Sequence, residues 1–122
     1  MTRKVPQIVR EWCASIQDRN PQQQLSFYSK DAVLLATFES MCVGHEEMYD
    51  YFIDFLNKEN LRCRIIDNIT MIDVDRDSVI ANGLYGFSFT DEEGIEQDVI
   101  ARYTFVINNG YIITQHSSLN PE

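Results

Sequence analysis

The chain has 122 residues, with 10 Lys and Arg against 19 Asp and Glu, which gives a formal net charge of −9 at pH 7. This length predicts a single domain over residues 1–122, and the negative charge argues against nucleic acid or an anionic membrane as a partner. No apolar run approaches the roughly 20 residues of a membrane span, and the N-terminus lacks the apolar run of a secretion signal. We therefore expect a cytoplasmic protein.

Two helices are predicted at the start of the chain. Apolar residues recur at helical spacing over residues 5–16, and Pro6 suits a first helical turn. This helix is expected to end near Asp18. Asn20 and Pro21 then have the pattern of a helix cap followed by a first-turn proline. A second, short helix is therefore expected to pack against the first.

A strand, a short strand and a third helix are predicted next. Residues 31–37 form a nearly continuous apolar run, which is typical of a buried strand. Gly44 breaks the chain after a short second strand. The third helix has Glu46 and Glu47 in its first turn, where the helix dipole favours acids. Its apolar stripe consists of Met48, Tyr51, Phe52, Phe55 and Leu56.

The second half of the chain has the period-two spacing of strands. We expect four long strands over residues 65–74, 79–89, 99–107 and 111–117. Because the connections between them are short and rich in turn residues, these strands are expected to be antiparallel. The predicted fold class is α+β, a cone-like curved antiparallel sheet with three helices on its concave face. The hollow between the helices and the sheet is the expected ligand site.

The strand over residues 98–107 is largely apolar on both faces. One face carries Ile100, Arg102, Thr104 and Val106, and the other carries Ala101, Tyr103, Phe105 and Ile107. An antiparallel sheet normally presents one polar face to water, so we expect a second copy of the chain to cover the face away from the helices. The alternative is a surface that tolerates some aromatic residues. The predicted interface consists of Tyr103, Phe105, Tyr111 and Ile113.

Arg102 and His116 are candidate ligand-binding residues. A guanidinium in an apolar strand must be balanced, either by a helix acid in an internal ion pair or by the carboxylate of a small ligand. A three-residue turn at 108–110 would pair Arg102 with His116 and place both on one face of the sheet. A two-residue turn would place His116 beside Tyr103 instead. His116 is also the candidate acid–base group if the protein is an enzyme.

Tyr85, Trp12 and Thr37 complete the candidate ligand-binding set. Tyr85 lies between Gly83 and Gly86, and glycines within a strand suggest bulges or a close approach of the backbone. The Tyr85 hydroxyl is a candidate to point into the hollow, with simple packing as the alternative. Trp12 faces the same hollow from the first helix, where a core role is the simpler interpretation.

The sequence gives no signal for a metal or another cofactor. The three cysteines, Cys13, Cys42 and Cys63, share no metal-like spacing and are expected to be reduced core residues. His45 and His116 are too few for a histidine-built metal site. The tract from 91 to 98 lacks the ligand spacing of a calcium loop. We therefore expect no metal, cofactor or calmodulin to be needed.

Five segments together resemble the association (hub) domain of calcium/calmodulin-dependent protein kinase II, in its free-standing form without a kinase. These are residues 31–37, 51–56, 83–85, 101–106 and 116–121. The resemblance implies the nuclear-transport-factor-two-like fold, self-assembly through the sheet into dimers or rings of dimers, and a pocket lined by an arginine at the position of Arg102. Free-standing relatives usually have two adjacent histidines near the end, whereas here Gln115 precedes His116.

The wider superfamily also contains ketosteroid isomerases and polyketide cyclases. Resemblance to the isomerases places their catalytic aspartate at Ala36 and their oxyanion-stabilising tyrosine at Trp12. Ala36 cannot abstract a proton, and Trp12 cannot donate a phenolic hydrogen bond. Glu39 is a possible displaced base. Two functions stay open: a self-assembling domain that binds a small carboxylate or polar molecule, and a small lyase, isomerase or cyclase that uses His116 and Arg102.

Overall fold

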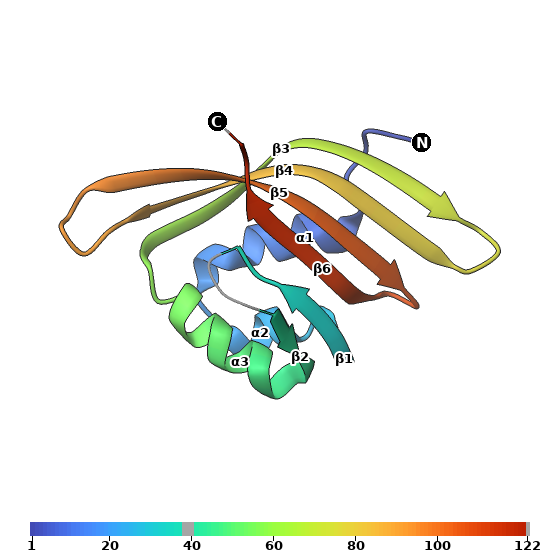
Figure 1. Cartoon of the computed structure of the whole chain (residues 1–122), viewed down its shortest axis with the longest axis horizontal. Helices are drawn as coiled ribbons and strands as arrows, with labels where there is room; N and C mark the ends of the chain where they lie inside the picture. Colours follow the sequence, from blue (N-terminus) through green and yellow to red (C-terminus); the bar gives the residue numbers. More distant parts are fainter. Residues whose placement is uncertain (38–40, 122) are drawn as a thin grey trace.

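The computed structural model describes residues 1–37 and 41–121. Within them the chain forms helices on one side of a strongly curved sheet, and the hairpins of the sheet project beyond the helices at both ends (Figure 1). The elements are α1 (Gln7–Ser15), a 3₁₀ turn (Ile16–Asp18), α2 (Pro21–Leu25), β1 (Tyr28–Leu35), β2 (Met41–Val43), α3 (Gly44–Phe55), β3 (Glu59–Asp73), β4 (Ser78–Thr90), β5 (Glu96–Asn108) and β6 (Tyr111–Leu119). None of these helices is long and apolar enough to cross a membrane.

The Asn20-Pro21 signal acts where it was expected, whereas Pro6 is the N-cap residue of α1 and not part of its first turn. The Asn20 side chain accepts hydrogen bonds from the backbone N–H groups of Gln22 and Gln23, both at 3.1 Å, and Pro21 opens α2. This cap satisfies donors that have no partner inside the helix. Arg19 reverses the chain between the 3₁₀ turn and α2 with a positive φ of 56°.

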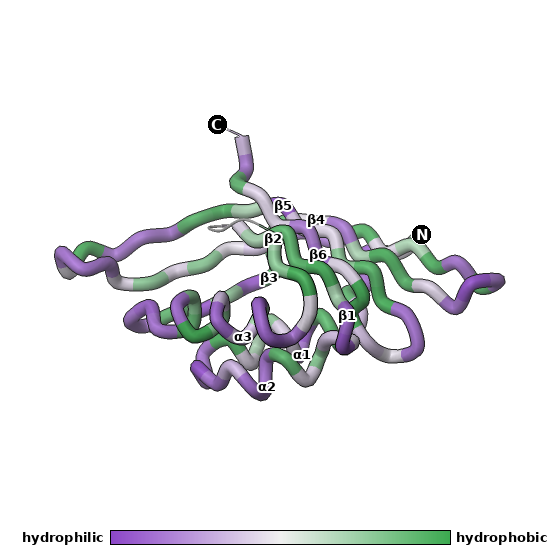
Figure 2. The backbone as a smooth tube through the Cα atoms, turned by 60° about the horizontal axis from the view of Figure 1, so that its bottom comes forward, coloured by the Kyte–Doolittle hydropathy of each residue, from purple (hydrophilic) through white to green (hydrophobic). Residues whose placement is uncertain are grey.

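The six strands form one sheet in the order β2-β1-β6-β5-β4-β3. The meander from β3 to β6 is antiparallel throughout, as the short turns predicted. The parallel pairing of β1 with β6 was not predicted, because no local signal marks a contact between strands so distant in sequence. The α+β fold class is confirmed. Figure 2 shows the hydrophilic hairpin tips at the two ends of the sheet.

The face of the sheet beneath the helices is filled by aromatic side chains. Trp12 of α1 stacks on Tyr85 with ring centroids 5.7 Å apart and meets Phe105 edge-on at 5.3 Å. Such pairs add stabilisation beyond the area that they bury. Tyr103 and Phe105 are only 3% and 0% exposed.

This packing corrects part of the predicted interface. Tyr103 and Phe105 lie in the core of their own chain, so neither can contact a partner. Tyr111 and Ile113, by contrast, are 51% and 38% exposed. The prediction failed because β5 is apolar on both faces, and its alternation alone does not indicate which face meets the helices.

We call the opposite side of the sheet the outer face. The strand register places Arg102 beside Leu84 and Val106 beside Ile80 on this side, and all four side chains are at least partly accessible to solvent. Arg102 is therefore not buried in an apolar strand, which corrects the expectation that a helix acid or a ligand carboxylate must balance its charge. Other apolar side chains of the outer face are Val33, Leu35, Met41, Val43, Ile69, Met71 and Ile100.

Candidate functional site

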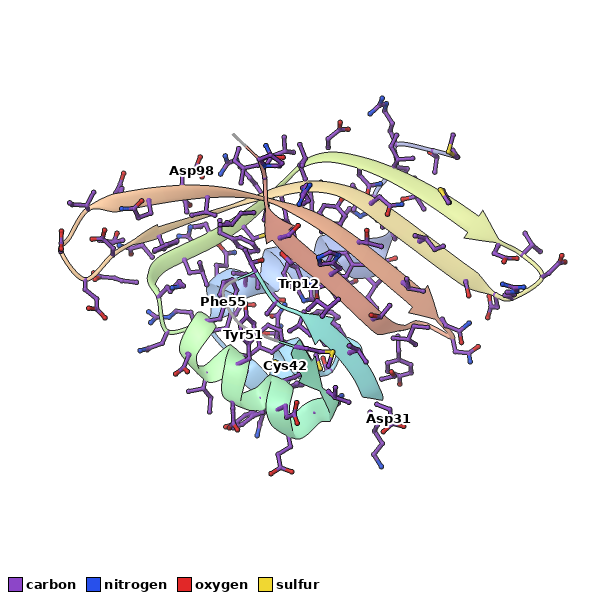
Figure 3. The ribbon with its side chains drawn as sticks, viewed as in Figure 1. Trp12, Asp31, Cys42, Tyr51, Phe55 and Asp98 are labelled. Atoms are coloured by element: carbon purple, nitrogen blue, oxygen red, sulfur yellow. The ribbon has the colours of Figure 1, made fainter. Side chains whose placement is uncertain are left out.

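A small cavity lies between the helices and the concave face of the sheet. Trp12 of α1 and Tyr51 and Phe55 of α3 gather beneath the sheet in Figure 3. The free space is about 10 Å³, which is roughly the minimum for one water molecule. The described residues that line it are Trp12, Leu34, Ala36, Thr37, Tyr51, Phe52, Phe55, Tyr85, Phe87, Gln115 and Ser117.

A continuous chain of hydrogen bonds follows the wall of this cavity. Its members come from α1, from β1 and the residues after it, and from β4 and β6, so the sheet and the helices must both be in place to form it. Among the residues that the structure describes, every buried side-chain nitrogen or oxygen atom has a hydrogen-bond partner. In order, the hydrogen-bond chain joins Trp12, Tyr28, Gln115, Tyr85, Ser117 and Thr37.

Gln115 is the centre of the hydrogen-bond chain. Its Oε1 accepts from the Tyr28 hydroxyl, and its Nε2 donates to Tyr85 Oη at 3.1 Å. At one end, Trp12 Nε1 donates to Tyr28 Oη at 2.9 Å. At the other end, Tyr85 Oη donates to Ser117 Oγ at 2.6 Å. An amide donates and accepts at once, so Gln115 joins two hydroxyls that could not both be satisfied by an apolar residue.

The two tyrosines of the hydrogen-bond chain are held in their neutral form. Tyr28 is 2% exposed and Tyr85 is 1% exposed. Burial raises the pKa of Tyr28 well above its ordinary value, and it raises the pKa of Tyr85 in the same way, because a phenolate loses its hydration in the core. Both hydroxyls are therefore hydrogen-bond donors over the physiological pH range.

The structure brings three of the predicted ligand-binding residues together. Trp12, Thr37 and Tyr85 all line the cavity. Arg102 and His116 do not, because both belong to the outer face. The prediction that all five share one hollow is therefore wrong. The same orientation of β5 that buries Tyr103 turns its neighbour Arg102 away from the cavity.

The β5–β6 turn explains the position of His116. Asn109 and Gly110 form a two-residue turn with φ values of 52° and 81°, as in the type I′ turns that favour Asn-Gly. Without further irregularity this turn would place His116 beside Tyr103. A bulge between Val106 and Ile107 shifts the register, so that His116 pairs with Thr104 and Arg102 pairs with Ser118.

Arg102 and His116 line a shallow depression of about 260 Å³ on the outer face. The Arg102 Nε donates to Ser118 Oγ at 3.2 Å. Among the residues that the structure describes, no carboxylate forms an ion pair with Arg102. Both side chains are exposed to solvent, so this depression is a different environment from the closed cavity.

Sequence reasoning missed Tyr28, Gln115 and Ser117. Gln115 was noted only because it stands where related sequences have a histidine, yet it is 2% exposed and central to the hydrogen-bond chain. The available signal was alternation: once His116 faces outward, its neighbours Gln115 and Ser117 must face inward. Glu39, the possible displaced base, lies outside the described residues.

Within residues 1–37 and 41–121 there is no group of three or more His, Cys, Asp or Glu side chains that could hold a metal ion. The cavity itself is lined, among the described residues, by aromatic, aliphatic, hydroxyl and amide groups. These groups can form hydrogen bonds and aromatic contacts.

Comparison with known proteins places this chain in a family. Residues 1–121 match the family described as the calcium/calmodulin dependent protein kinase II association domain. A solved protein of Xanthomonas campestris, provisionally named such an association domain, is 35% identical, with a TM-score of 0.86 over 94% of this chain and 84% of its own. No curated protein matches the chain.

More distant solved structures share the fold alone. A protein of the NTF2-like family from Streptomyces avermitilis, provisionally named a dehydratase, has a TM-score of 0.82 at 9% identity over 94% of this chain and 93% of its own. A Xanthomonas campestris protein, provisionally named a polyketide cyclase, has a TM-score of 0.66 at 13% identity over 93% and 87%. On the match over residues 1–121, the chain belongs to the calcium/calmodulin dependent protein kinase II association domain family.

Proposed function

We propose that this protein is a self-associating domain that binds a small, uncharged polar molecule in its interior cavity. The observation that carries the binding half of the proposal is the hydrogen-bond chain centred on Gln115. A mostly apolar cavity with a few convergent polar groups is the usual form of a small-molecule site. The family name and the apolar outer face support the association half.

The composition of the cavity favours an uncharged ligand. An anion brought into this space would lose its hydration, and the described lining offers no basic side chain to compensate for that loss. A ligand with amide or hydroxyl groups could instead exchange hydrogen bonds with Gln115, Tyr85 and Ser117. A molecule larger than one water requires side chains of α3, such as Tyr51 or Phe55, to move.

A small carboxylate fits the outer-face depression better than the cavity. There the Arg102 guanidinium could form the paired hydrogen bonds that arginine makes with carboxylates. The depression is open to solvent, however, and a single exposed charge pair contributes little to affinity. The cavity is therefore the stronger candidate, and Arg102 becomes the residue that separates the two sites experimentally.

The enzymatic alternative receives less support from the geometry. His116 and Arg102 lie on the face of the sheet opposite the cavity, so they cannot act there as acid–base group and anion anchor. Ala36 and Trp12, at the positions of the isomerase's catalytic groups, both line the cavity but can neither abstract a proton nor supply a phenolic hydrogen bond.

Self-association through the outer face is supported by its exposed apolar side chains. Leu35, Met41 and Met71 are 39%, 57% and 40% exposed on this face, and half-buried aliphatic residues join them across the sheet. Exposed apolar side chains gathered on one face favour an interaction site, although polar Thr114 and His116 of β6 lie between those of β1 and β5. A stable interface would bury on the order of 1,200 Å² or more in total.

Changing Ile80 to glutamate should therefore weaken the assembly. Ile80 lies on the outer face between Met71 and Val106 in the strand register, and a buried carboxylate at an apolar interface is costly. Light scattering should give a wild-type mass of at least twice the 14.2 kDa of one chain. The Ile80→Glu mass should fall toward that of a single chain.

The matched control is Ile95→Glu, because Ile95 is 53% exposed at the β4–β5 hairpin, away from the outer face. This variant should keep the wild-type mass. A monomeric wild-type protein at micromolar concentration would refute association, and equal weakening by both variants would refute the outer face as the interface.

A further inference from the structure

Two cysteine side chains from different layers of the fold lie in direct contact. Cys13 is on α1 and Cys63 is on β3, and their Sγ atoms are 2.9 Å apart. An S–S bond is about 2.05 Å long, so the two sulfurs are roughly 0.9 Å beyond covalent distance. They are 50 residues apart in the sequence, and only the packing of α1 against β3 brings them together.

The two cysteines of the pair differ in how far each residue is exposed. Cys13 is 7% exposed, whereas Cys63 is partly exposed. Cys42, the third cysteine, lies on β2 at the opposite edge of the sheet in strand order. The pair is thus set apart from the other thiol of the chain.

The ionisation of the two thiols is asymmetric. The hydrogen bond with Cys63 lowers the pKa of Cys13, and burial raises the pKa of Cys63. One thiol of a close pair then ionises more readily than the other, as in dithiols that exchange with disulfides. The contact between the sulfurs is the primary observation, and this asymmetry is consistent with it.

We propose that Cys13 and Cys63 form a reversible intramolecular disulfide that fastens α1 to β3. The oxidant is a small-molecule disulfide such as glutathione disulfide. The thiolate of one cysteine attacks a sulfur of the oxidant, forms a mixed disulfide and releases one small thiolate. The other cysteine loses its proton to solvent and attacks the protein sulfur, which closes the Cys13–Cys63 bond and releases the second small thiolate. The protein loses two electrons, and the small disulfide gains them.

The bond would stiffen one wall of the cavity. Trp12 precedes Cys13, and Phe87 pairs with Cys63 in the sheet; both aromatic residues line the cavity. The proposal itself does not depend on a ligand in that cavity. Closing a loop of this length restricts the unfolded chain, and we expect the melting temperature to rise by about 10 °C on oxidation.

The experiment treats the wild-type protein and Cys42→Ser with glutathione disulfide and then measures mass, alkylatable thiols and melting temperature. Both proteins should lose two thiols and about 2 Da, the mass of two hydrogen atoms released when the bond forms. Peptide mapping should identify the Cys13–Cys63 link. Dithiothreitol should restore the thiols and the lower melting temperature.

Cys63→Ser and Cys13→Ser are the variants that cannot form the bond. Each should show no rise in melting temperature and at most a glutathione adduct, and circular dichroism establishes that each is folded. If one variant fails to fold, the other variant and the disulfide mapped in the wild-type protein still test the proposal. Three alkylatable thiols after treatment, a link through Cys42 or between two chains, or oxidation without a rise in melting temperature would overturn the proposal.

Discussion

Replacing Gly83 by alanine is expected to lower the free energy of unfolding by about 3 kcal/mol or more. A Cβ atom at this position would collide with the backbone oxygen of Asp67 and lie 2.7 Å from the Tyr103 hydroxyl oxygen. That hydroxyl is itself fixed, because it donates to Asn68 Oδ1 at 2.7 Å. The backbone of β3 cannot move away without breaking the ladder between β3 and β4.

Gly86→Ala is the matched control, three residues along the same strand. Its Cβ would lie 2.7 Å from the guanidinium carbon of Arg64. The Arg64 side chain is 50% exposed and pairs with Asp98 at the surface, so it can move at a cost under about 1 kcal/mol. Urea denaturation of both variants measures the difference. Equal stabilities would show that the close approach at Gly83 does not constrain the sheet.

The second large effect is expected at alkaline pH. Tyr28 and Tyr85 have raised pKa values in the folded protein because of burial, whereas an exposed tyrosine in the unfolded chain ionises near pH 10. Above about pH 10 the unfolded state therefore binds fewer protons than the folded state. The contribution of these two tyrosines to stability is fully present below that pH. Above it, each tyrosine should lower the free energy of unfolding by about 1.4 kcal/mol per pH unit.

Tyr28 and Tyr85 together should thus contribute close to 3 kcal/mol per unit to the fall above about pH 10, and Tyr103, whose pKa is also raised by burial, adds to it. Tyr85→Phe removes one titrating group. The free energy of unfolding of this variant should therefore fall less steeply than that of the wild type, by about 1.4 kcal/mol less for each pH unit. Urea denaturation between pH 8 and roughly pH 11.5, where the buried groups stay protonated, gives both slopes. A stability independent of pH in this range would mean that the hydroxyls are reached by water and ionise in the folded state.

Local patterns predicted the elements of this fold because the signals lie within a few residues of each other. Asn20 and Pro21 mark the start of α2, and period-two spacing marks β4 and β5. Pairing between distant strands has no such signal. The contact of β1 with β6 and the bulge after Val106 therefore appeared only in the structure.

The candidate site could be predicted only in part, because its residues also come from distant parts of the chain. Trp12 and Tyr85 were identified as aromatic residues facing the hollow, and they do line the cavity. Arg102 was predicted to be a pocket residue because it is a charge in an apolar strand. Its apolar neighbours in the sheet, such as Leu84, lie with it on the outer face. Gln115 carried no sign of its central role, because an amide becomes informative only when its two hydroxyl partners are known.

The most direct test of the central claim, that the interior cavity is the ligand site, is a titration followed by tryptophan fluorescence. The chain has one tryptophan, and Trp12 lines the cavity and donates to Tyr28. A panel of small amides, polyols and carboxylates would be titrated into the wild-type protein, Ser117→Ala and Arg102→Ala. Ser117 accepts from Tyr85 in the cavity, and Arg102 lies on the outer face.

The account predicts a saturable change in Trp12 fluorescence with at least one uncharged compound, weakened in Ser117→Ala and unchanged in Arg102→Ala. A response to carboxylates alone that disappears in Arg102→Ala, or no response to any compound, would contradict it.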